Sequence, residues 1–296
     1  MKPESSELNQ PERLSIPIGG YRIVAHRWSG NSPTILFCHA TGFHGRIWDR
    51  IISHLGDYDC VSIDLRGHGD SDKPDTSYNW DSFVPDVLEI IRKLGINDVI
   101  GVGHSMGAHV ITKAAIGNPS LIRGLVLCDP SIFERHRYRD FNYSQKTEHP
   151  VSKRRNNWES PKEMYDRLRR HKNFALWEPD VLDDYCNYGL ELNQEGSHYQ
   201  LKCPPSVEAQ MYGAYIDPSI IEELPKYKNP VHVMLARERL PEEKFMELGP
   251  SITRPDLKDL LPNSTFERFG SNSHFLPMEN TEAVSKSIKK MVTRVF

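Results

Sequence analysis

Residues 99–110 read VIGVGHSMGAHV and place a serine between two glycines, where an apolar run passes into a helical pattern. Gly103, Ser105 and Gly107 form the pattern GxSxG. A serine on a sharp turn from strand to helix holds its hydroxyl exposed, and its neighbours two positions away must be very small. The start of a helix also favours negative charge. The spacing therefore indicates nucleophilic chemistry at Ser105.

The same stretch fits a second pattern, the glycine-rich turn of a dinucleotide-binding fold. Gly101, Gly103 and Gly107 give GxGxxxG, and Asp129 ends the next apolar run, where a ribose-binding acid would lie. The standard fingerprint has glycine at its sixth position, which here is Met106, and it normally opens the fold instead of coming at about the fourth strand. We therefore favour the nucleophile pattern, although GxSxG alone recurs by chance in roughly one chain in ten of this length.

Three further stretches supply the context for Ser105. HATGFHGRIW (39–48) follows an apolar run, DLRGHGDSD (64–72) follows the next, and SNSHFLPME (271–279) places His274 just before the last helical pattern. With GHSMG between them, this order resembles the α/β-hydrolase family, in its serine esterase and lipase-like branch, from about residue 20 to residue 296. The resemblance implies that Ser105 is the nucleophile and His274 the base. It also implies that the backbone amides of Thr41 and Met106 form the oxyanion hole.

The third member of the triad departs from the family pattern. Most members carry this acid after the strand that follows an insertion, but there ARERLP places Leu240 at the expected position. Glu238, or its neighbours Glu242 and Glu243, is one alternative. Asp129 is the other, because it ends a buried run 24 residues after Ser105, on a strand whose end lies next to the usual position. We expect Asp129 to be the acid, although Asp-Pro also caps turns.

Other polar residues near these motifs have simpler interpretations. His39 and His104 flank the expected site without occupying the position of the base, so we interpret both as structural or as part of its wall. Asp64 and Arg66 belong to the DLRGHGDS turn and are expected to fix loops. No paired Cys/His spacing predicts a metal site, and no cofactor is expected.

Alternating strand and helix patterns predict the elements that position these residues. Near-continuous apolar runs are typical of strands covered on both faces of a parallel sheet, and amphipathic patterns lie between them. The fold class expected is therefore α/β: the α/β-hydrolase fold, with a mostly parallel, doubly wound sheet and helices on both faces. The predicted strands are 21–28, 34–39, 59–64, 98–102, 124–128, 231–235 and 265–269, and the predicted helices are 47–55, 83–94, 106–116 and a terminal helix around 284–295.

The segment 130–225 interrupts this alternation. It is rich in aromatic residues and contains no convincing strand, so we expect a helical cap or lid inserted into a core formed by 1–129 and 226–296. Residues 134–172 hold 12 basic against 6 acidic residues, whereas 178–223 hold one lysine against 10 acidic residues. These opposed charges are expected to pair with each other or to face water. The polar residues 1–19 are expected to form a flexible leader rather than a secretory signal.

Composition limits the possible partners. The 296 residues carry 37 basic and 40 acidic side chains, which gives no global basic field for nucleic acid. No apolar run reaches the ~20 residues of a membrane span. Five cysteines without CxxC spacing indicate reduced thiols in a cytoplasmic protein.

The expected function is that of a serine hydrolase, a carboxylesterase acting on a small-molecule ester through an acyl-enzyme. Acyl-CoA or other thioesters, lactones, C–C bonds and amides are alternative substrates on the same fold. The alternative from a different class is a hydrolase-fold ligand-binding protein without catalysis.

Overall fold

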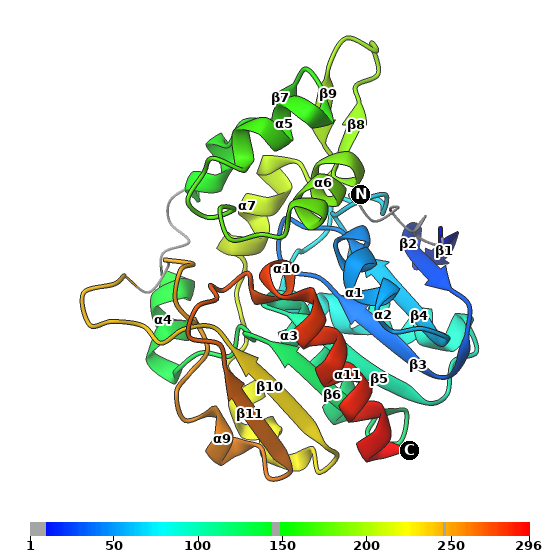
Figure 1. Cartoon of the computed structure of the whole chain (residues 1–296), viewed down its shortest axis with the longest axis vertical. Helices are drawn as coiled ribbons and strands as arrows, with labels where there is room; N and C mark the ends of the chain where they lie inside the picture. The colour runs from blue at the N-terminus through cyan, green and yellow to red at the C-terminus, as the bar shows by residue number, and fades with distance from the viewer. Residues whose placement is uncertain (1–9, 144–148, 245–246) are drawn as a thin grey trace, which may run out of the picture.

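The computed structural model describes residues 10–143, 149–244 and 247–296. Its main sheet has eight strands in the order β1-β2-β4-β3-β5-β6-β10-β11 (Figure 1). In this order, β2 pairs antiparallel with both β1 and β4, and all other neighbouring strands pair parallel. The predicted fold class is therefore confirmed. The bounds are β1 Glu12–Ile18, β2 Tyr21–Trp28, β3 Asn31–Cys38, β4 Tyr58–Asp64, β5 Val99–His104, β6 Ile122–Cys128, β10 Val231–Leu235 and β11 Ser264–Arg268.

The central strands are apolar throughout because helices cover both faces of the sheet. In β3, Leu36 and Cys38 face one hydrophobic cluster, whereas Ile35 and Phe37 face the other. The first cluster includes α2 (Val84–Lys93) and α3 (Met106–Gly117), and the second includes α1 (Asp49–Ser53) and α11 (Thr281–Val295). Successive side chains of a strand point to opposite faces, so burial on both faces removes the polar alternation.

The first strand of the sheet was not predicted. Residues 12–18 form β1, which pairs antiparallel with β2, so the expectation of a flexible leader over residues 1–19 is wrong for this part. In ERLSIPI only Ile16 and Ile18 are buried, because β1 lies at the edge of the sheet. With only two buried residues, this strand has almost no apolar pattern in the sequence, so from the sequence it is interpreted as part of a polar terminal segment. Residues 1–9 of the expected leader lie outside the described residues.

Residues 130–225 connect β6 to β10, which are neighbours in the sheet. The expectation of an insertion without strands is wrong, since β7, β9 and β8 form a small antiparallel sheet. These strands are two or three residues long and partly exposed, which is too short for a period of two to appear in the sequence. Residues 144–148 of the segment lie outside the described residues. The bounds are α4 Arg135–Tyr143, β7 Asn157–Trp158, α5 Pro161–Leu168, α6 Pro179–Tyr188, β8 Leu190–Leu192, β9 Tyr199–Leu201, α7 Pro205–Gly213 and α8 Ile220–Glu223.

The inserted elements α5, α6, α7 and the small sheet gather on one side of the main sheet, beside α10 (Leu276–Glu279) (Figure 1). Glu178, which precedes α6, accepts a hydrogen bond of 2.8 Å from the amide of Thr281. Arg154 and Glu208 form an ion pair of 2.6 Å between the basic and acidic parts of the insertion. Contacts therefore tie the insertion both to itself and to the core. Among the described residues, none of the helices has the length and apolar composition of a membrane span.

The close packing of α3 against β3 generates a prediction for Gly107. A Cβ atom at this position would lie 2.2 Å from the carbonyl oxygen of Cys38, so neither backbone has room for a side chain. We expect Gly107→Ala to lower the free energy of unfolding by about 1–3 kcal/mol or more, as overpacking does. Urea unfolding measures the change.

Gly117, at the other end of the same helix, is the matched control. A Cβ atom there meets nothing within 4 Å. Gly117→Ala should leave stability unchanged or raise it by up to about 1 kcal/mol, because alanine favours the helix. Equal effects of the two substitutions would contradict the packing argument.

Candidate active site

Ser105 lies at the turn between β5 and α3, with a left-handed backbone at φ 54° and ψ −119°. Its amide donates a hydrogen bond of 3.2 Å to the carbonyl of Cys128, at the end of β6. The flanking glycines are sterically required, since a Cβ atom at Gly103 would lie 2.5 Å from the Cα atom of Ala108. Sequence and structure therefore agree on why small residues flank this serine.

Asp129 follows β6 directly and is wholly buried, with φ 39°. Its Oδ1 accepts hydrogen bonds from the amide of Ala236 (3.1 Å) and the hydroxyl of Ser251 (2.5 Å), and its Oδ2 accepts one from the amide of Ile252 (3.2 Å). Burial by itself would raise the pKa of Asp129, but His274 and these donors outweigh it and lower the pKa below its usual range. The carboxylate is therefore kept ionised although it is buried.

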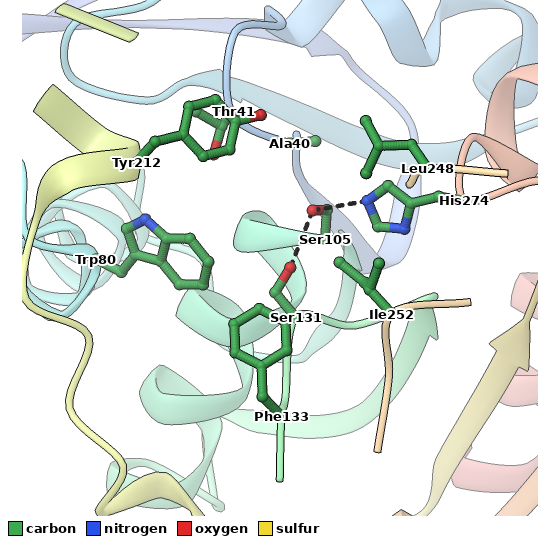
Figure 2. Close-up of a pocket in the computed structure, with 10 residues that line it drawn as sticks. All are labelled: Ala40, Thr41, Trp80, Ser105, Ser131, Phe133, Tyr212, Leu248, Ile252 and His274. Atoms are coloured by element: carbon green, nitrogen blue, oxygen red, sulfur yellow. Dashed lines mark hydrogen bonds between the residues drawn. The ribbon is translucent and has the colours of Figure 1, made fainter. Parts of the chain in front are cut away.

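His274 connects the other two residues. Its Nδ1 lies 2.6 Å from Asp129 Oδ2, and its Nε2 lies 3.0 Å from Ser105 Oγ (Figure 2 shows the second contact). Donation from Nδ1 to the carboxylate leaves Nε2 free to accept the serine proton. The backbone of His274 is held by its amide to Leu248 (3.0 Å) and by its carbonyl to His104 Nε2 (2.8 Å). The structure thus brings together the three residues that the sequence analysis singled out.

The alternative acids lie elsewhere. Glu238 is exposed, and it lines a separate cavity that does not include His274. Glu242 is also exposed. Glu243 forms an ion pair with Arg237 and accepts a hydrogen bond of 2.8 Å from the amide of Leu240. Among the described residues, Asp129 is the carboxylate that contacts His274.

Thr41 and Met106 approach Ser105 from two directions. Met106 is the first residue of α3, so its amide belongs to the helix turn that has no acceptor of its own. Thr41 lines the same cavity as Ser105, and its hydroxyl lies 3.2 Å from the sulfur of Met106. Both residues therefore lie beside Ser105.

The loop that carries Thr41 is held by two neutral imidazoles. The amide of Gly42 donates to His68 Nε2 (3.0 Å), and the amide of Leu65 donates to His39 Nε2 (3.1 Å). A ring nitrogen that accepts an amide proton carries no proton itself. Burial lowers the pKa of His39 to about 4 and holds that of His68 well below its usual range. His39 therefore has the structural role that the sequence analysis assigned to it.

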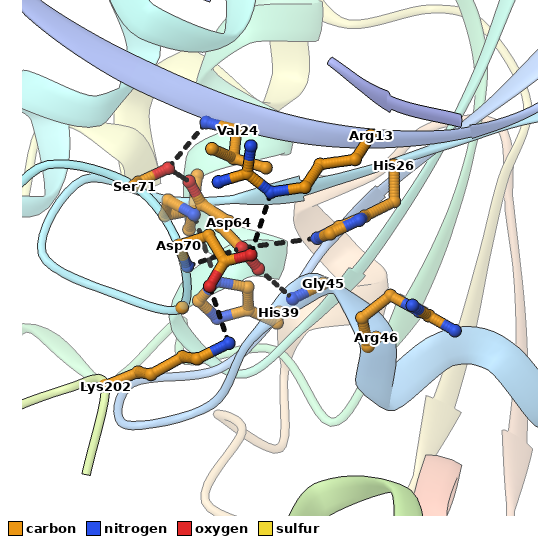
Figure 3. Close-up of polar contacts among 12 residues, drawn as sticks. Arg13, Val24, His26, His39, Gly45, Arg46, Asp64, Asp70, Ser71 and Lys202 are labelled. Atoms are coloured by element: carbon orange, nitrogen blue, oxygen red, sulfur yellow. Dashed lines mark hydrogen bonds and ion pairs between the residues drawn. The ribbon is translucent and has the colours of Figure 1, made fainter. Parts of the chain in front are cut away.

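Asp64 fixes the other end of this loop (Figure 3). Its carboxylate accepts hydrogen bonds from the amides of Gly45 (2.5 Å) and Asp70 (2.8 Å), and His26 lies 3.3 Å away. Burial opposes ionisation, but His26 and the amide of Gly45 outweigh it, and the pKa of Asp64 falls well below its usual range. Asp70 in turn pairs with Lys202 of the insertion (2.6 Å). The DLRGHGDS turn thus anchors loops, as expected.

Two serines at the site were missed by the sequence analysis. Ser131 Oγ lies 3.0 Å from Ser105 Oγ (Figure 2), and its amide donates to the carbonyl of Ser105 (3.1 Å). In the sequence, the signal for Ser131 was its position two residues after Asp129, just beyond the end of β6. Ser251 donates to Asp129 from a loop without any motif, so the sequence held no signal for it.

Ser105 lines the smaller of two adjoining cavities. The smaller has a volume of about 40 Å³ and a largely apolar wall that includes Ala40, Trp80 and Phe133. The larger has a volume of about 450 Å³ and lies mostly against the insertion. Thr41, Tyr212 and Leu248 line both cavities. In the described part of the chain, no group of three or more His, Cys, Asp or Glu side chains is arranged to hold a metal.

Comparison with known proteins identifies the family. The sequence matches the model of the alpha/beta hydrolase family over residues 35–286.

The chain belongs to the alpha/beta hydrolase family.

Relatives within this family have diverse names. The chain is 36% identical over 104 residues to 2-(acetamidomethylene)succinate hydrolase from Mesorhizobium japonicum, a match that covers 35% of this chain and 37% of that relative. It is 30% identical over 133 residues to a haloalkane dehalogenase from the same organism, over 45% of this chain and 43% of the relative. The matches thus span less than half of these relatives.

Solved structures share the fold at low identity. A crystal structure of E-2-(acetamidomethylene)succinate hydrolase superposes with a TM-score of 0.76 at 19% identity, covering 96% of this chain and 99% of that chain. A thermophilic esterase from Thermogutta terrifontis superposes with a TM-score of 0.69, also at 19% identity and over 96% and 99% of the two chains. These likenesses establish the architecture of this alpha/beta hydrolase.

Its buried histidines generate a prediction for the pH dependence of stability. Burial lowers the pKa of His39 to about 4 and that of His44 and His104 to about 3, whereas in the unfolded chain a histidine titrates near 6.5. Between about pH 6.5 and pH 4 the unfolded state therefore binds more protons. The free energy of unfolding should fall with decreasing pH by up to about 1.4 kcal/mol per pH unit for each histidine.

Urea unfolding between about pH 7.5 and pH 5.5 measures this slope. Burial raises the pKa of Asp49 to about 6, and this carboxylate acts on the slope in the opposite direction, so the histidine contribution is obtained by comparing variants that all retain Asp49. His104→Gln should reduce the slope by one histidine's contribution. His54→Gln, at an exposed position, is the control and should leave it unchanged. The same slope in both variants would contradict the assignment of His104 as a buried neutral group.

Proposed function

We propose that this alpha/beta hydrolase is a serine hydrolase that cleaves carboxylic esters through an acyl-enzyme. The observation that carries the proposal is the hydrogen-bonded chain from Ser105 through His274 to the buried Asp129. A serine hydroxyl at its ordinary pKa is a weak nucleophile, so an adjacent base must take its proton. A non-catalytic binding protein has no need of this alignment.

In the first half of the reaction, Ser105 Oγ attacks the carbonyl carbon while His274 Nε2 takes the hydroxyl proton. The amides of Thr41 and Met106 donate to the oxygen that becomes negative, and each such donor contributes roughly 3 kcal/mol to lowering the barrier. His274 then returns its proton to the leaving alcohol. The ester bond breaks, and the acyl group remains on Ser105.

In the second half, His274 takes a proton from water, which attacks the acyl carbonyl. The carboxylic acid leaves as the proton passes from His274 to Ser105 Oγ. Asp129 stays ionised throughout, because it orients the imidazole and stabilises its positive form. Its lowered pKa fits that role.

The cavities support a division of the substrate into two parts. The small cavity of about 40 Å³ has room for a short acyl group beside Ser105. The larger cavity would take the remainder, with the insertion 130–225 acting as the cap. The five free cysteines are all buried, which supports a reducing compartment such as the cytoplasm.

Cleavage of a short N-acyl group is the second candidate. A sequence relative and a structural neighbour both carry the name of a hydrolase acting on 2-(acetamidomethylene)succinate, which contains an acetamido group. The same serine, base and oxyanion donors serve amide and ester hydrolysis, and the leaving amine takes its proton from His274.

A fluorophosphonate probe tests the nucleophile, since it reacts with an activated serine. We expect the wild-type chain to be labelled and Ser105→Ala not to be, because no base-activated hydroxyl remains at position 105. Intact-protein mass spectrometry measures the adduct. Ser131→Ala, which keeps Ser105, is the control for labelling at the neighbouring hydroxyl, and an unlabelled wild-type chain would refute the proposal.

Two substitutions identify the acid. Asp129→Asn keeps the shape of the side chain but removes the charge and the preference for the correct tautomer, so kcat for p-nitrophenyl acetate should fall by about 10³- to 10⁴-fold. Glu238→Gln should change kcat by less than about twofold, because no interaction with His274 is lost. The reverse pattern would place the acid in the loop after β10.

A further inference from the structure

The larger cavity carries charge that catalysis by the triad does not use. Its lining includes three arginines, Arg154, Arg155 and Arg167, and one carboxylate, Glu208. Two histidines, His149 and His171, also line it. A cavity with this excess of cationic groups, adjoining the small cavity that Ser105 lines, favours an anionic ligand.

Arg154 is held in a fixed orientation. Its Nη1 donates to Glu208 (2.6 Å), its Nη2 donates to the hydroxyl of Tyr185 (3.2 Å), and 26% of its side chain is exposed. Glu208 lies against the loop that carries Thr41, since its Oε1 would be 2.5 Å from a Cβ atom at Gly42. The pair is nearly neutral as a whole, but it presents an oriented guanidinium to the cavity.

The second arginine is already neutralised. Arg155 pairs with Glu163 (2.6 Å) and lies over the ring of Trp158, with its guanidinium carbon 4.3 Å from the ring centroid. Its charge therefore contributes little to binding an anion in the cavity.

Arg167 differs from both. It lies in the last turn of α5, it is exposed, and its guanidinium makes no hydrogen bond or ion pair within the described part of the chain. A planar guanidinium with five donors matches the oxygens of a carboxylate or phosphate. Glu163 attracts it electrostatically, but of the three arginines in the described lining it is the one whose guanidinium has no hydrogen-bond acceptor.

The rest of the lining is apolar and aromatic. Leu168, Phe174 and Phe275 line the cavity together with Trp158. Phe174 and Phe275 stack with ring centroids 6.2 Å apart. A ligand that fits this cavity therefore combines an apolar or aromatic body with a charged end.

We propose that the larger cavity is a subsite for an anionic group on the leaving part of the substrate, a carboxylate or a phosphate. Arg167 forms the ion pair with this group and Arg154 adds oriented donors, while the acyl group lies in the small cavity beside Ser105. This inference rests on the proposed function and names its substrate class: short-chain acyl esters of anionic, largely apolar alcohols or thiols.

Matched substrates test the subsite. 4-Acetoxybenzoate and 4-acetoxybenzamide share an acetyl group and a ring but differ in charge. We expect kcat/KM to be at least about tenfold higher for the carboxylate, mainly through a lower KM, because a charge-assisted ion pair is formed only by the anion. Arg167→Gln should bring the ratio to within about threefold of unity. Arg170→Gln, at an exposed position nearby that does not line the cavity, should preserve the wild-type ratio.

A second pair of substrates distinguishes the source of the anion. Acetyl-CoA carries phosphates that S-acetylpantetheine lacks. A charge preference that depends on Arg167 in this pair alone would assign the site to phosphate, and one in the benzoate pair alone would assign it to carboxylate. Either result supports an anion subsite.

A ratio near unity for the wild type in both pairs, or a ratio that Arg167→Gln leaves unchanged, would overturn the inference. Hydrolysis of the neutral 4-acetoxybenzamide that depends on Ser105 would then leave the proposed function standing. Binding to Ser105→Ala, followed by the intrinsic tryptophan fluorescence to which Trp158 in the cavity wall contributes, provides a readout without turnover. Equal affinity for 4-acetoxybenzoate and 4-acetoxybenzamide there would likewise overturn the subsite.

Discussion

The site depends on one buried carboxylate. Asp129 is wholly removed from water, and a charge in that position costs several kcal/mol unless donors surround it. Its donors come from the segment after β10, from the loop at 251–252 and from His274 after β11. Parallel pairing of β6, β10 and β11 brings these segments to one edge of the sheet. The groups that stabilise this charge therefore include the imidazole of His274, which the same hydrogen bond orients toward Ser105.

Buried hydrogen-bonding groups also hold the loop on the other side of Ser105. The loop that carries Thr41 rests on the imidazole nitrogens of His39 and His68 and on the carboxylate of Asp64, all buried. These acceptors hold the backbone of the loop in place through buried hydrogen bonds. The insertion reaches this region through the contact of Lys202 with Asp70. The insertion is thus attached to the turn at 64–72, whose Asp64 in turn anchors the loop that carries Thr41.

Local patterns made much of this predictable. Buried strands and the turn at Ser105 leave short-range signals, and the end of β6 lies next to the end of β10 in any sheet of this order, which directed attention to Asp129. The prediction missed β1, the small sheet and Ser251, in each case for a physical reason. β1 and the small sheet are edge or short strands with few buried side chains. Ser251 is brought to Asp129 by a loop whose path depends on tertiary packing, and no spacing encodes it.

The order of the functional residues along the chain has a consequence for the divergence of such proteins. The loop with Thr41, Ser105 and Asp129 all lie between residues 39 and 129, before the insertion, and His274 alone follows it. The insertion therefore contains none of these residues, whereas the segment after β10 supplies Ser251 and Ile252 as donors to Asp129. Drift in the insertion can therefore change the wall of the larger cavity while one contiguous block of about ninety residues, with a single distant histidine, is inherited intact.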